Sequence, residues 1–464
     1  MPLRWDVREH ISLAAYFGKW ILIAIPLGAI VGVAVAFFLW LLNVATVTRW
    51  NNPWLLYLLP LAGIPMVIAY KHLGGESIRG NNLVLDEIHE PDAGVTWRMA
   101  PLVLFATVIT HLFGGSAGRE GTAVQMGGSI ADIFPKIHKF SREDRSILLT
   151  CGIAAGFGAV FGTPLAGAVF SLEVLAVGRM RYTALVPSLI ASIAADRACL
   201  LVGIDHQPYF IQSAVSLKIG SETFGFQPML WLKVVLVAVV FGLVSFLFSE
   251  TYHTLSALFT KYIKVYWLRP FVGGILVILI TLALGTYDYL GIGVTTQNGT
   301  GVSIANAFHA GGATPWSWFW KLALTSITLA CGFKGGEVTP LFFIGATLGA
   351  ALAVTLHAPI ALFAGLGFIA VFAGASNTPL ACTIMGIELF GSEYTTFFAV
   401  ACFVAYLFSG HSGIYLSQRI DVPKGGYLDF PVTGTLRSIR EGRAHYGLGV
   451  RWQRVRDKLR SYLP

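Results

Sequence analysis

A glutamate flanked by glycines, within otherwise apolar sequence, is the first candidate for chemistry in this chain. Glu120 lies in the stretch Gly-Arg-Glu-Gly-Thr at residues 118–122, and an apolar run follows it. A carboxylate in a membrane-embedded segment is energetically expensive, so it marks a functional site by default. If a helix begins here, its free N–H groups and the positive end of its dipole favour an anion. Pairing of Glu120 with the neighbouring Arg119, as a structural turn, is the alternative interpretation.

A second glutamate has a similar setting and suggests that the chain is duplicated. Glu337 lies in Gly-Gly-Glu-Val-Thr-Pro at residues 335–340, and Glu337 − Glu120 gives an offset of 217 residues. Downstream of each glutamate the sequence Thr-Pro-Leu-Ala occurs, at residues 163–166 and 378–381, an offset of 215 (378 − 163). Landmarks in the same order with nearly constant spacing indicate an internal repeat, which many transporter folds contain. Two half-helices whose N-termini meet at the midplane would form a pocket for an anion.

The composition places these elements in a membrane. Of the 464 residues, 55% are hydrophobic and 12% are charged, whereas soluble domains carry about 25% charged residues. Long apolar runs approach the ~20 residues that a helical span needs; they cover residues 20–42, 54–70, 230–248 and 271–284. Other apolar runs are short and broken by some of the 51 glycines, which predicts half-helices ending inside the membrane. We therefore expect an all-α polytopic membrane protein.

The distribution of basic residues predicts the orientation of the chain. The net charge is +8, and the basic residues lie at the chain ends and in short loops, which is not a nucleic-acid-binding pattern. Arg4 and Arg8 precede the first span, and the tail from Lys424 onward is strongly basic, so both termini are expected to be cytoplasmic. The first 19 residues include Asp6 and Glu9 and no apolar core, so no cleavable signal peptide is expected.

Two further groups of residues are assigned structural roles. The cysteines lie in apolar surroundings without a CxxC pair, so we expect small core residues and neither disulfides nor metal ligands; they are Cys151, Cys199, Cys331, Cys382 and Cys402. The segment from Asp86 to Glu90 lacks metal-ligand spacing and is predicted to be a solvated loop or an interfacial helix face. Just before it, the Gly-Asn-Asn stretch at 80–82 is a plausible helix start that offers N–H donors. The irregular segment 200–227 is expected to separate the two halves.

With these motifs in place, the chain resembles the CLC family of anion channels and anion/proton exchangers. Residues 118–122 resemble the family's Gly-[Lys/Arg]-Glu-Gly-Pro motif, and Thr-Pro-Leu-Ala-Gly at 163–167 resembles its Ala-Pro-Leu-Ala-Gly motif. The resemblance implies the CLC fold, in which two inverted-topology repeats bring broken half-helices together at the membrane midplane. It also implies a homodimer with one pore per subunit.

The resemblance also implies a division of the chain. Residues 1–19 are expected to form a cytoplasmic N-terminal segment, followed by a CLC transmembrane domain over residues 20–420. The repeat halves are expected at approximately 20–220 and 228–420. Residues 421–464 are expected to be a basic cytoplasmic tail, too short for a regulatory nucleotide-binding domain.

Where the motifs of this chain differ from those of the chloride-transporting relatives, they resemble the motifs of the bacterial fluoride/proton antiporter branch. Those relatives have Gly-Ser-Gly-Ile-Pro where this chain has Gly-Asn-Asn at 80–82, and a proline in place of Thr122. In the fluoride branch an Asn or Met occupies position 81, a Thr ends the first motif, and an additional glutamate stands where this chain has Glu337. Chloride/proton exchangers also carry a second glutamate as internal proton acceptor, whereas Glu173 is followed here by Val174.

The resemblance assigns roles to individual residues. Glu120 would be the gating glutamate, which occupies the anion's place when ionised and carries the proton when protonated. Glu337 would share proton transfer and be protonated or hydrogen-bonded for part of the cycle. Donors for a strongly hydrated anion such as fluoride are expected at the following residues: Gly80, Asn81, Asn82, Gly118, Gly121, Val338, Thr339 and Tyr415. Tyr415 could alternatively be an interfacial aromatic anchor. Glu173 and Glu388 are expected to be structural, binding backbone N–H groups or nearby arginines.

The resemblance therefore implies a secondary active transporter that exports fluoride in exchange for protons and confers fluoride resistance. Its partners would be fluoride, protons and the lipid of a bacterial inner membrane, and no metal or other cofactor is expected. A chloride/proton exchanger or a passive anion channel of the same family stays open as an alternative. An enzyme is disfavoured because the eleven histidines are scattered, no HExxH motif occurs, and Ser116 has no evident catalytic partner.

Overall fold

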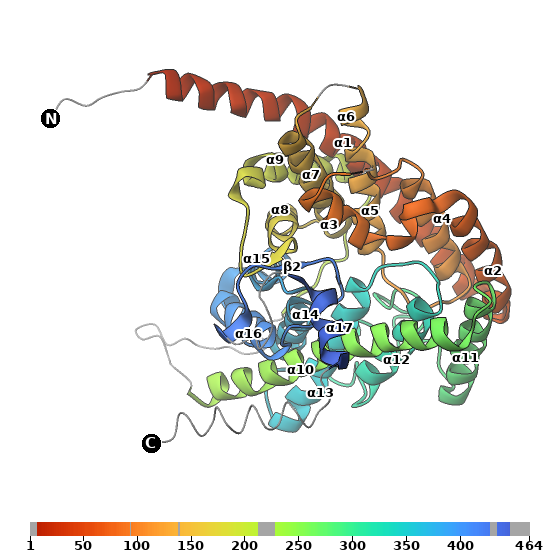
Figure 1. Ribbon diagram of the computed structural model, residues 1–464. Helices are drawn as coiled ribbons and strands as arrows, with labels where there is room; N and C mark the ends of the chain where they lie inside the picture. Colours follow the sequence, from red (N-terminus) through yellow and green to blue (C-terminus); the bar gives the residue numbers. More distant parts are fainter. Residues whose placement is uncertain (1–6, 93, 138–139, 212–227, 427–433, 446–464) are drawn as a thin grey trace.

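The computed structural model describes residues 7–445 except 93, 138–139, 212–227 and 427–433. The described part is mostly helical (Figure 1). Six of its helical segments are long and apolar enough to cross a membrane. In chain order, the helices are α1 (Val7–Asn51), α2 (Leu59–Ala69), α3 (Asn81–His89), α4 (Met99–Leu112), α5 (Glu120–Ala131), α6 (Phe134–Ile137), α7 (Arg142–Phe161), α8 (Pro164–Glu173), α9 (Leu185–Leu201), α10 (Pro228–Tyr262), α11 (Leu268–Leu284), α12 (Ser317–Ala330), α13 (Val338–Leu356), α14 (Ile360–Ser376), α15 (Pro379–Phe390), α16 (Thr395–Phe408) and α17 (Leu436–His445).

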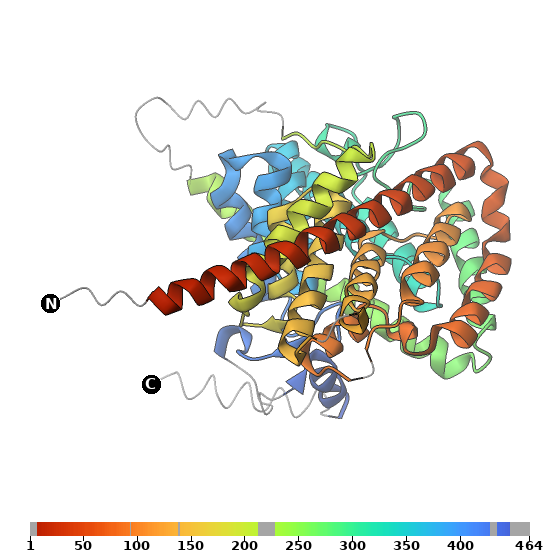
Figure 2. The same cartoon turned by 90° about the horizontal axis from the view of Figure 1, so that it is seen from above.

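The helices of the two halves pack in the same pattern, as the repeated motifs predict. In the first half α1 packs on α9 and α5 packs on α7; in the second half α10 packs on α16 and α13 packs on α14. The long helices α1 and α10 lie on opposite sides of the bundle (Figure 1), and Figure 2 shows α1 crossing diagonally over α9. The halves join where α8 meets α15, the two helices that begin with the repeated Pro-Leu-Ala sequence.

Several helices are too short to cross a bilayer, which confirms the predicted half-helices. α5 has 12 residues, α8 has 10 and α15 has 12, whereas a span needs about 20. Proline at the first position of α8 and α15 fixes their starts, because it lacks the N–H that would continue a helix backwards. The polar ends of short helices can be held inside a membrane only where protein or water satisfies the backbone.

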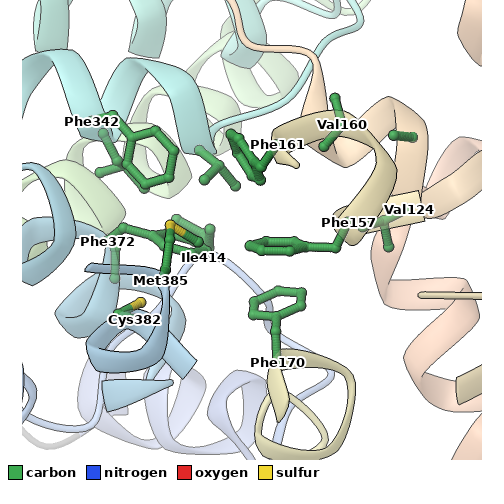
Figure 3. Close-up of a cluster of buried hydrophobic side chains, with 14 of the residues drawn as sticks. Val124, Phe157, Val160, Phe161, Phe170, Phe342, Phe372, Cys382, Met385 and Ile414 are labelled. Atoms are coloured by element: carbon green, nitrogen blue, oxygen red, sulfur yellow. The ribbon is translucent and has the colours of Figure 1, made fainter. Parts of the chain in front are cut away.

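Aromatic side chains from both halves form the core beside these helix ends. Figure 3 shows Phe157 and Phe170 from the first half facing Phe342 and Phe372 from the second. The ring centroids of Phe157 and Phe170 are 4.3 Å apart, and those of Phe342 and Phe372 are 5.5 Å apart in an edge-on arrangement. Across the halves, the ring centroids of Phe161 and Phe342 are 5.2 Å apart and those of Phe170 and Phe372 are 5.8 Å apart. Ring packing of this kind adds to the burial energy and helps to hold the halves together.

A small sheet connects the end of the second half to the first. β1 (Ala176–Val177) pairs in parallel with β2 (Arg419–Ile420), and β2 pairs antiparallel with β3 (Gly434–Thr435). In register, Ala176 lies opposite Arg419. The sheet is too short to alter the all-α class, but it holds the segment after Tyr415 against the end of α8.

The expected boundary at residues 19 and 20 falls inside α1, so this helix runs from the N-terminal segment into the first span. Another expectation is wrong in part. The segment from Asp86 to Glu90 was predicted to be a solvated loop or an interfacial helix face, and the loop alternative is wrong because α3 continues through His89. Within it, the Glu87 side chain is buried, at only 5% exposed. The reason is a charge partner distant in sequence: Arg145 donates to Glu87 at 2.9 Å and to Asp132 at 2.7 Å.

Other expectations hold within the described residues. All five cysteines are free and buried. Residues 204–211 of the predicted connection between halves have no regular structure, and its remainder from 212 lies outside the described residues. The same is true of Arg4 and of the basic tail from residue 446 onward.

Candidate functional site

The two glycine-glutamate stretches meet each other through their backbones. The N–H of Gly118 donates to the carbonyl of Gly336 at 2.6 Å, and the N–H of Gly336 donates back to Gly118 at 2.8 Å. A Cβ atom on Gly118 would lie 2.8 Å from Pro340 Cδ, and one on Gly336 would lie 2.8 Å from the Gly121 nitrogen. Glycine is therefore required at both positions for this approach. The bridge brings the N-termini of α5 and α13 together.

The carboxylate of Glu120 occupies the N-terminus of the opposite helix. Glu120 is the first residue of α5 and is fully buried. Its Oε2 atom accepts the N–H of Thr339 at 3.0 Å and the N–H of Arg119 at 3.1 Å. Its Oε1 atom accepts the hydroxyl of Thr339 and lies 3.8 Å from Arg119 Nε. A carboxylate is thus held by free donors at the start of α13, where the helix dipole also favours negative charge.

Glu337 and Asn81 lie on the other side of the same crossing, beside Gly121. A Cβ atom on Gly121 would lie 3.1 Å from Asn81 Nδ2 and 3.5 Å from Glu337 Oε2. Glu337 Oε2 and Asn81 Oδ1 are both buried and have no hydrogen-bond partner within the described part of the chain. Buried polar atoms are rarely left unpaired, so each one calls for a ligand, a water molecule or a proton. The structure therefore leaves open hydrogen-bonding capacity next to the Glu120 carboxylate.

The remaining predicted site residues lie around this centre, and they differ in whether their N–H or side-chain donors are free to bind an anion. Gly80 is the N-cap of α3 with a φ of 57°, and its N–H donates to Ser77. Asn82 is turned away, because its Oδ1 accepts the N–H of Ser417 at 2.9 Å. Val338 begins α13 and is buried. Tyr415 is only 4% exposed, which excludes an interfacial anchor. The Gly118 N–H is already bound to Gly336, so in this arrangement Gly118 shapes the site without offering a donor.

Sequence and structure comparisons with known proteins identify the family of this chain. The model of the voltage gated chloride channel family matches residues 62–410. A chloride/fluoride channel protein of Pseudomonas syringae pv. tomato is 48% identical over 413 residues, which cover 89% of both chains. The chain belongs to the CLC family. A crystal structure of a CLC-type fluoride/proton antiporter is similar with a TM-score of 0.80 and 32% identity, covering 87% of this chain and 98% of that one. A slow cyanobacterial Cl⁻/H⁺ antiporter, at 20% identity and a TM-score of 0.70 over 84% of this chain and 94% of that one, shares the fold.

Membership in this family makes the protein a multi-pass membrane transporter and establishes the two inverted repeats.

Glu173 and Glu388 bind backbone N–H groups of the opposite half in this CLC fold. Glu388 accepts the N–H groups of Leu165 and Ala166, at 2.9 and 2.8 Å. Glu173 accepts the N–H groups of Leu380 and Ala381, at 3.0 and 2.8 Å. Each glutamate lies in the last turn of one Pro-Leu-Ala helix and caps the start of the other, so the predicted N–H partners are present but belong to the other half.

Three basic side chains near the CLC site, two of them buried, were missed by the sequence reasoning. Lys334 stacks over the ring of Tyr70, with its Nζ atom 4.5 Å from the ring centroid. Lys321 is fully buried and donates to the carbonyls of Tyr289 and Gly291, at 3.1 and 2.7 Å. Arg49, in the last turn of α1, is 7% exposed. Their signal in the sequence was a lone basic residue in an apolar run, which marks function inside a membrane as an acidic residue does.

Proposed function

We propose that this protein exports fluoride from the cytoplasm in exchange for protons. The observation that carries the proposal is the position of Glu120, whose carboxylate fills the donor set at the start of α13. Anion and proton then compete for one place, because the same donors can hold either the ionised carboxylate or an anion. The antiporter named in the 32%-identical structure and the relative whose name includes fluoride support fluoride as the anion.

In the proposed cycle, Glu120 alternates between two roles. When ionised, it accepts the N–H and hydroxyl of Thr339 and blocks the site. When protonated, it loses the charge that these donors favour and leaves, carrying the proton with it. Fluoride then takes the vacated donors, with Gly121, Val338 and Tyr415 completing its shell. A small, strongly hydrated anion needs several strong donors to replace its water, and backbone N–H groups at a helix start provide them.

Glu337 and Asn81 are proposed to adapt this site to fluoride. Glu337 Oε2 lies near Gly121 without a hydrogen-bond partner among the described residues. A second carboxylate beside an anion would repel it, so Glu337 holds a proton while fluoride is bound and can donate that proton as a hydrogen bond. The Asn81 amide nitrogen lies on the same side of Gly121 and supplies a further donor. With Gly80 and Asn82 placing the start of α3, these groups form the inner wall of the site.

The proposal includes the cellular setting. The protein would lie in the bacterial inner membrane with both termini cytoplasmic, as the basic residues at its ends suggest. It would act as a homodimer with one pore in each subunit and need no cofactor. The transmembrane domain would cover residues 20–420, in halves of about 20–220 and 228–420, with residues 1–19 and 421–464 on the cytoplasmic side. Because hydrogen fluoride enters cells as a neutral acid and dissociates inside, such a protein would confer fluoride resistance.

Purified protein in fluoride-loaded liposomes tests the proposal. A fluoride electrode and a pH probe record together while the outward fluoride gradient is released. The expected result is fluoride efflux with proton movement into the vesicles, and much slower efflux from chloride-loaded vesicles. Glu120→Gln should abolish proton movement, and Glu337→Gln should weaken it. Glu76→Gln, at a surface glutamate that is 64% exposed, is the matched control and should behave as the wild type.

Two outcomes would contradict the proposal in different ways. Chloride efflux as fast as fluoride efflux, with protons still coupled, would indicate a chloride/proton exchanger and remove the selectivity assigned to Asn81 and Glu337. Anion efflux without any proton movement in the wild type would indicate a passive channel. Full coupling in Glu337→Gln would limit the proton role to Glu120.

A further inference from the structure

A buried arginine that forms no ion pair within the described residues lies on one side of the transport site. Arg49 is 7% exposed, its Nε atom has no hydrogen-bond partner, and its guanidinium group forms no ion pair within the described residues. By contrast, the neighbouring buried cation Lys321 donates to two carbonyl groups. A buried charge without compensation is strongly destabilising. The guanidinium group of Arg49 therefore needs a compensating group that the described chain does not provide.

Arg49 faces a cavity of about 340 Å³ at the end of α1. The other walls come from the end of α11 and the loop over residues 285–301. Among the lining hydroxyl groups, Thr296 Oγ1 is also buried and has no hydrogen-bond partner in the part of the chain that the structure describes. The lining carboxylate, Asp288, accepts the N–H of Val302 at 2.8 Å and forms no ion pair with Arg49. Two unsatisfied polar groups, one of them cationic, thus share one cavity.

The cavity borders both elements that form the transport site. Arg49 packs under the loop that leads to Glu120, because a Cβ atom on Gly114 would lie 3.6 Å from Arg49 Cδ. Gly293 lines the cavity, and a Cβ atom there would lie 2.8 Å from Phe343 of α13 and 3.3 Å from Lys321 Nζ. The Lys321 amino group therefore lies directly behind the cavity wall, where it donates to the carbonyls of Tyr289 and Gly291.

We propose that this cavity is a second anion site, where fluoride that has left the central site binds to Arg49 while it is only partly rehydrated. The inference rests on the proposed function for the identity of the anion. The guanidinium group supplies up to five N–H donors, and the Thr296 hydroxyl adds another. At about 30 Å³ for each water molecule, the volume holds an anion with several of its waters. Fluoride regains its hydration there before release, so the strongly dehydrating central site need not open directly to bulk water.

Bromide provides a direct test of binding, because its anomalous scattering locates it in crystals. Crystals of the wild type and of three variants are soaked in sodium bromide. We expect an anomalous peak at hydrogen-bond distance from the Arg49 guanidinium group, loss of this peak in Arg49→Gln and its retention in Arg49→Lys. Arg269→Gln is the matched control, since it removes the same charge at the opposite end of α11 and should keep the peak. Absence of the peak in the wild type, or its persistence in Arg49→Gln, overturns the inference.

A transport measurement tests whether the site lies on the fluoride path. In right-side-out vesicles with an acidic interior, fluoride uptake is measured against external fluoride above pH 7. Arg49→Gln should raise KM about tenfold, the scale of one charge-assisted hydrogen bond, at an unchanged maximal rate. Arg49→Lys should restore most of the affinity, and Arg269→Gln should leave KM unchanged.

The two measurements separate the site from the function. If the wild type exchanges fluoride for protons but KM is unchanged in Arg49→Gln, the cavity does not serve transport and the inference fails alone. If the wild type moves chloride with protons and bromide still binds at Arg49, the anion site holds, while fluoride as its occupant and the proposed function fail together.

Discussion

The reciprocal caps formed by Glu173 and Glu388 allow a quantitative prediction. Each carboxylate accepts two backbone N–H groups at the start of the helix in the other half. A glutamine has one acceptor oxygen, so Glu388→Gln keeps one bond and places its NH₂ group against the second N–H. The substitution removes one charge-assisted hydrogen bond and leaves one N–H donor unsatisfied, which should lower the free energy of unfolding by about 2–3 kcal/mol. Glu173→Gln removes the same contacts at the equivalent helix and should cost a similar amount.

The expected change in melting temperature follows from the size of the chain. At about 2.1 cal/mol/K for each residue, the unfolding entropy of 464 residues is roughly 1 kcal/mol/K, so each substitution should lower Tm by about 2–3 °C. Tm is measured in detergent by intrinsic tryptophan fluorescence. Glu393→Gln, at an exposed glutamate just after α15, is the control and should leave Tm unchanged.

Two results would refute this reasoning. An unchanged Tm in both variants would mean that the caps contribute nothing to the junction of the halves. A strong drop in only one variant would mean that the repeats are not energetically equivalent there. The proton-to-fluoride ratio is recorded in the same preparations and should stay at the wild-type value; its loss in either variant would make that glutamate part of the proton path.

Two further predictions concern the site and its support. Gly336→Ala should reduce fluoride transport at least tenfold while the protein still folds, because the added Cβ would lie 2.8 Å from the Gly121 nitrogen and 3.0 Å from the Glu120 nitrogen. Liposome efflux measures the transport rate, and size-exclusion profiles show whether the variant is folded. Gly18→Ala is the control, because nothing lies within 4 Å of the Cβ added there. Arg145→Gln should destabilise the protein by about 3–5 kcal/mol, because Glu87 and Asp132 are then left as buried carboxylates without their cation; tryptophan fluorescence would show a marked fall in Tm, and an unchanged Tm would contradict the prediction.

The sequence was sufficient where a local pattern determines the structure. The recurrence of Thr-Pro-Leu-Ala predicted two equivalent half-helices, because proline at the first helical position fixes a helix start wherever it occurs. The glycines around Glu120 and Glu337 predicted helix N-termini whose backbone N–H groups an ion can approach, since a close approach to the backbone requires the absence of a Cβ atom. These features need no information on distant partners.

The sequence was insufficient where a partner lies far along the chain. Glu173 binds N–H groups more than 200 residues away, and no local pattern names that partner. Glu87 was predicted to lie in a solvated loop or on an interfacial helix face because its cation, Arg145, belongs to another helix. Arg49 was absent from the predicted site for the same reason, because its cavity is completed by a loop from the other half.

A difference of one residue between the repeats explains why two similar glutamates can have two roles. The bridge pairs Gly118 with Gly336, so Glu120 follows its bridging glycine by two residues and Glu337 follows by one. Glu120 is the first helical residue of α5, whereas Glu337 is the N-cap of α13. One residue turns a side chain by about 100° around a helix axis. The Glu120 carboxylate therefore reaches the donors of α13, and Glu337 lies beside Gly121 without competing for them. In an equal register, both carboxylates would face the bridge in the same way, and each would repel the other from the place that the anion needs.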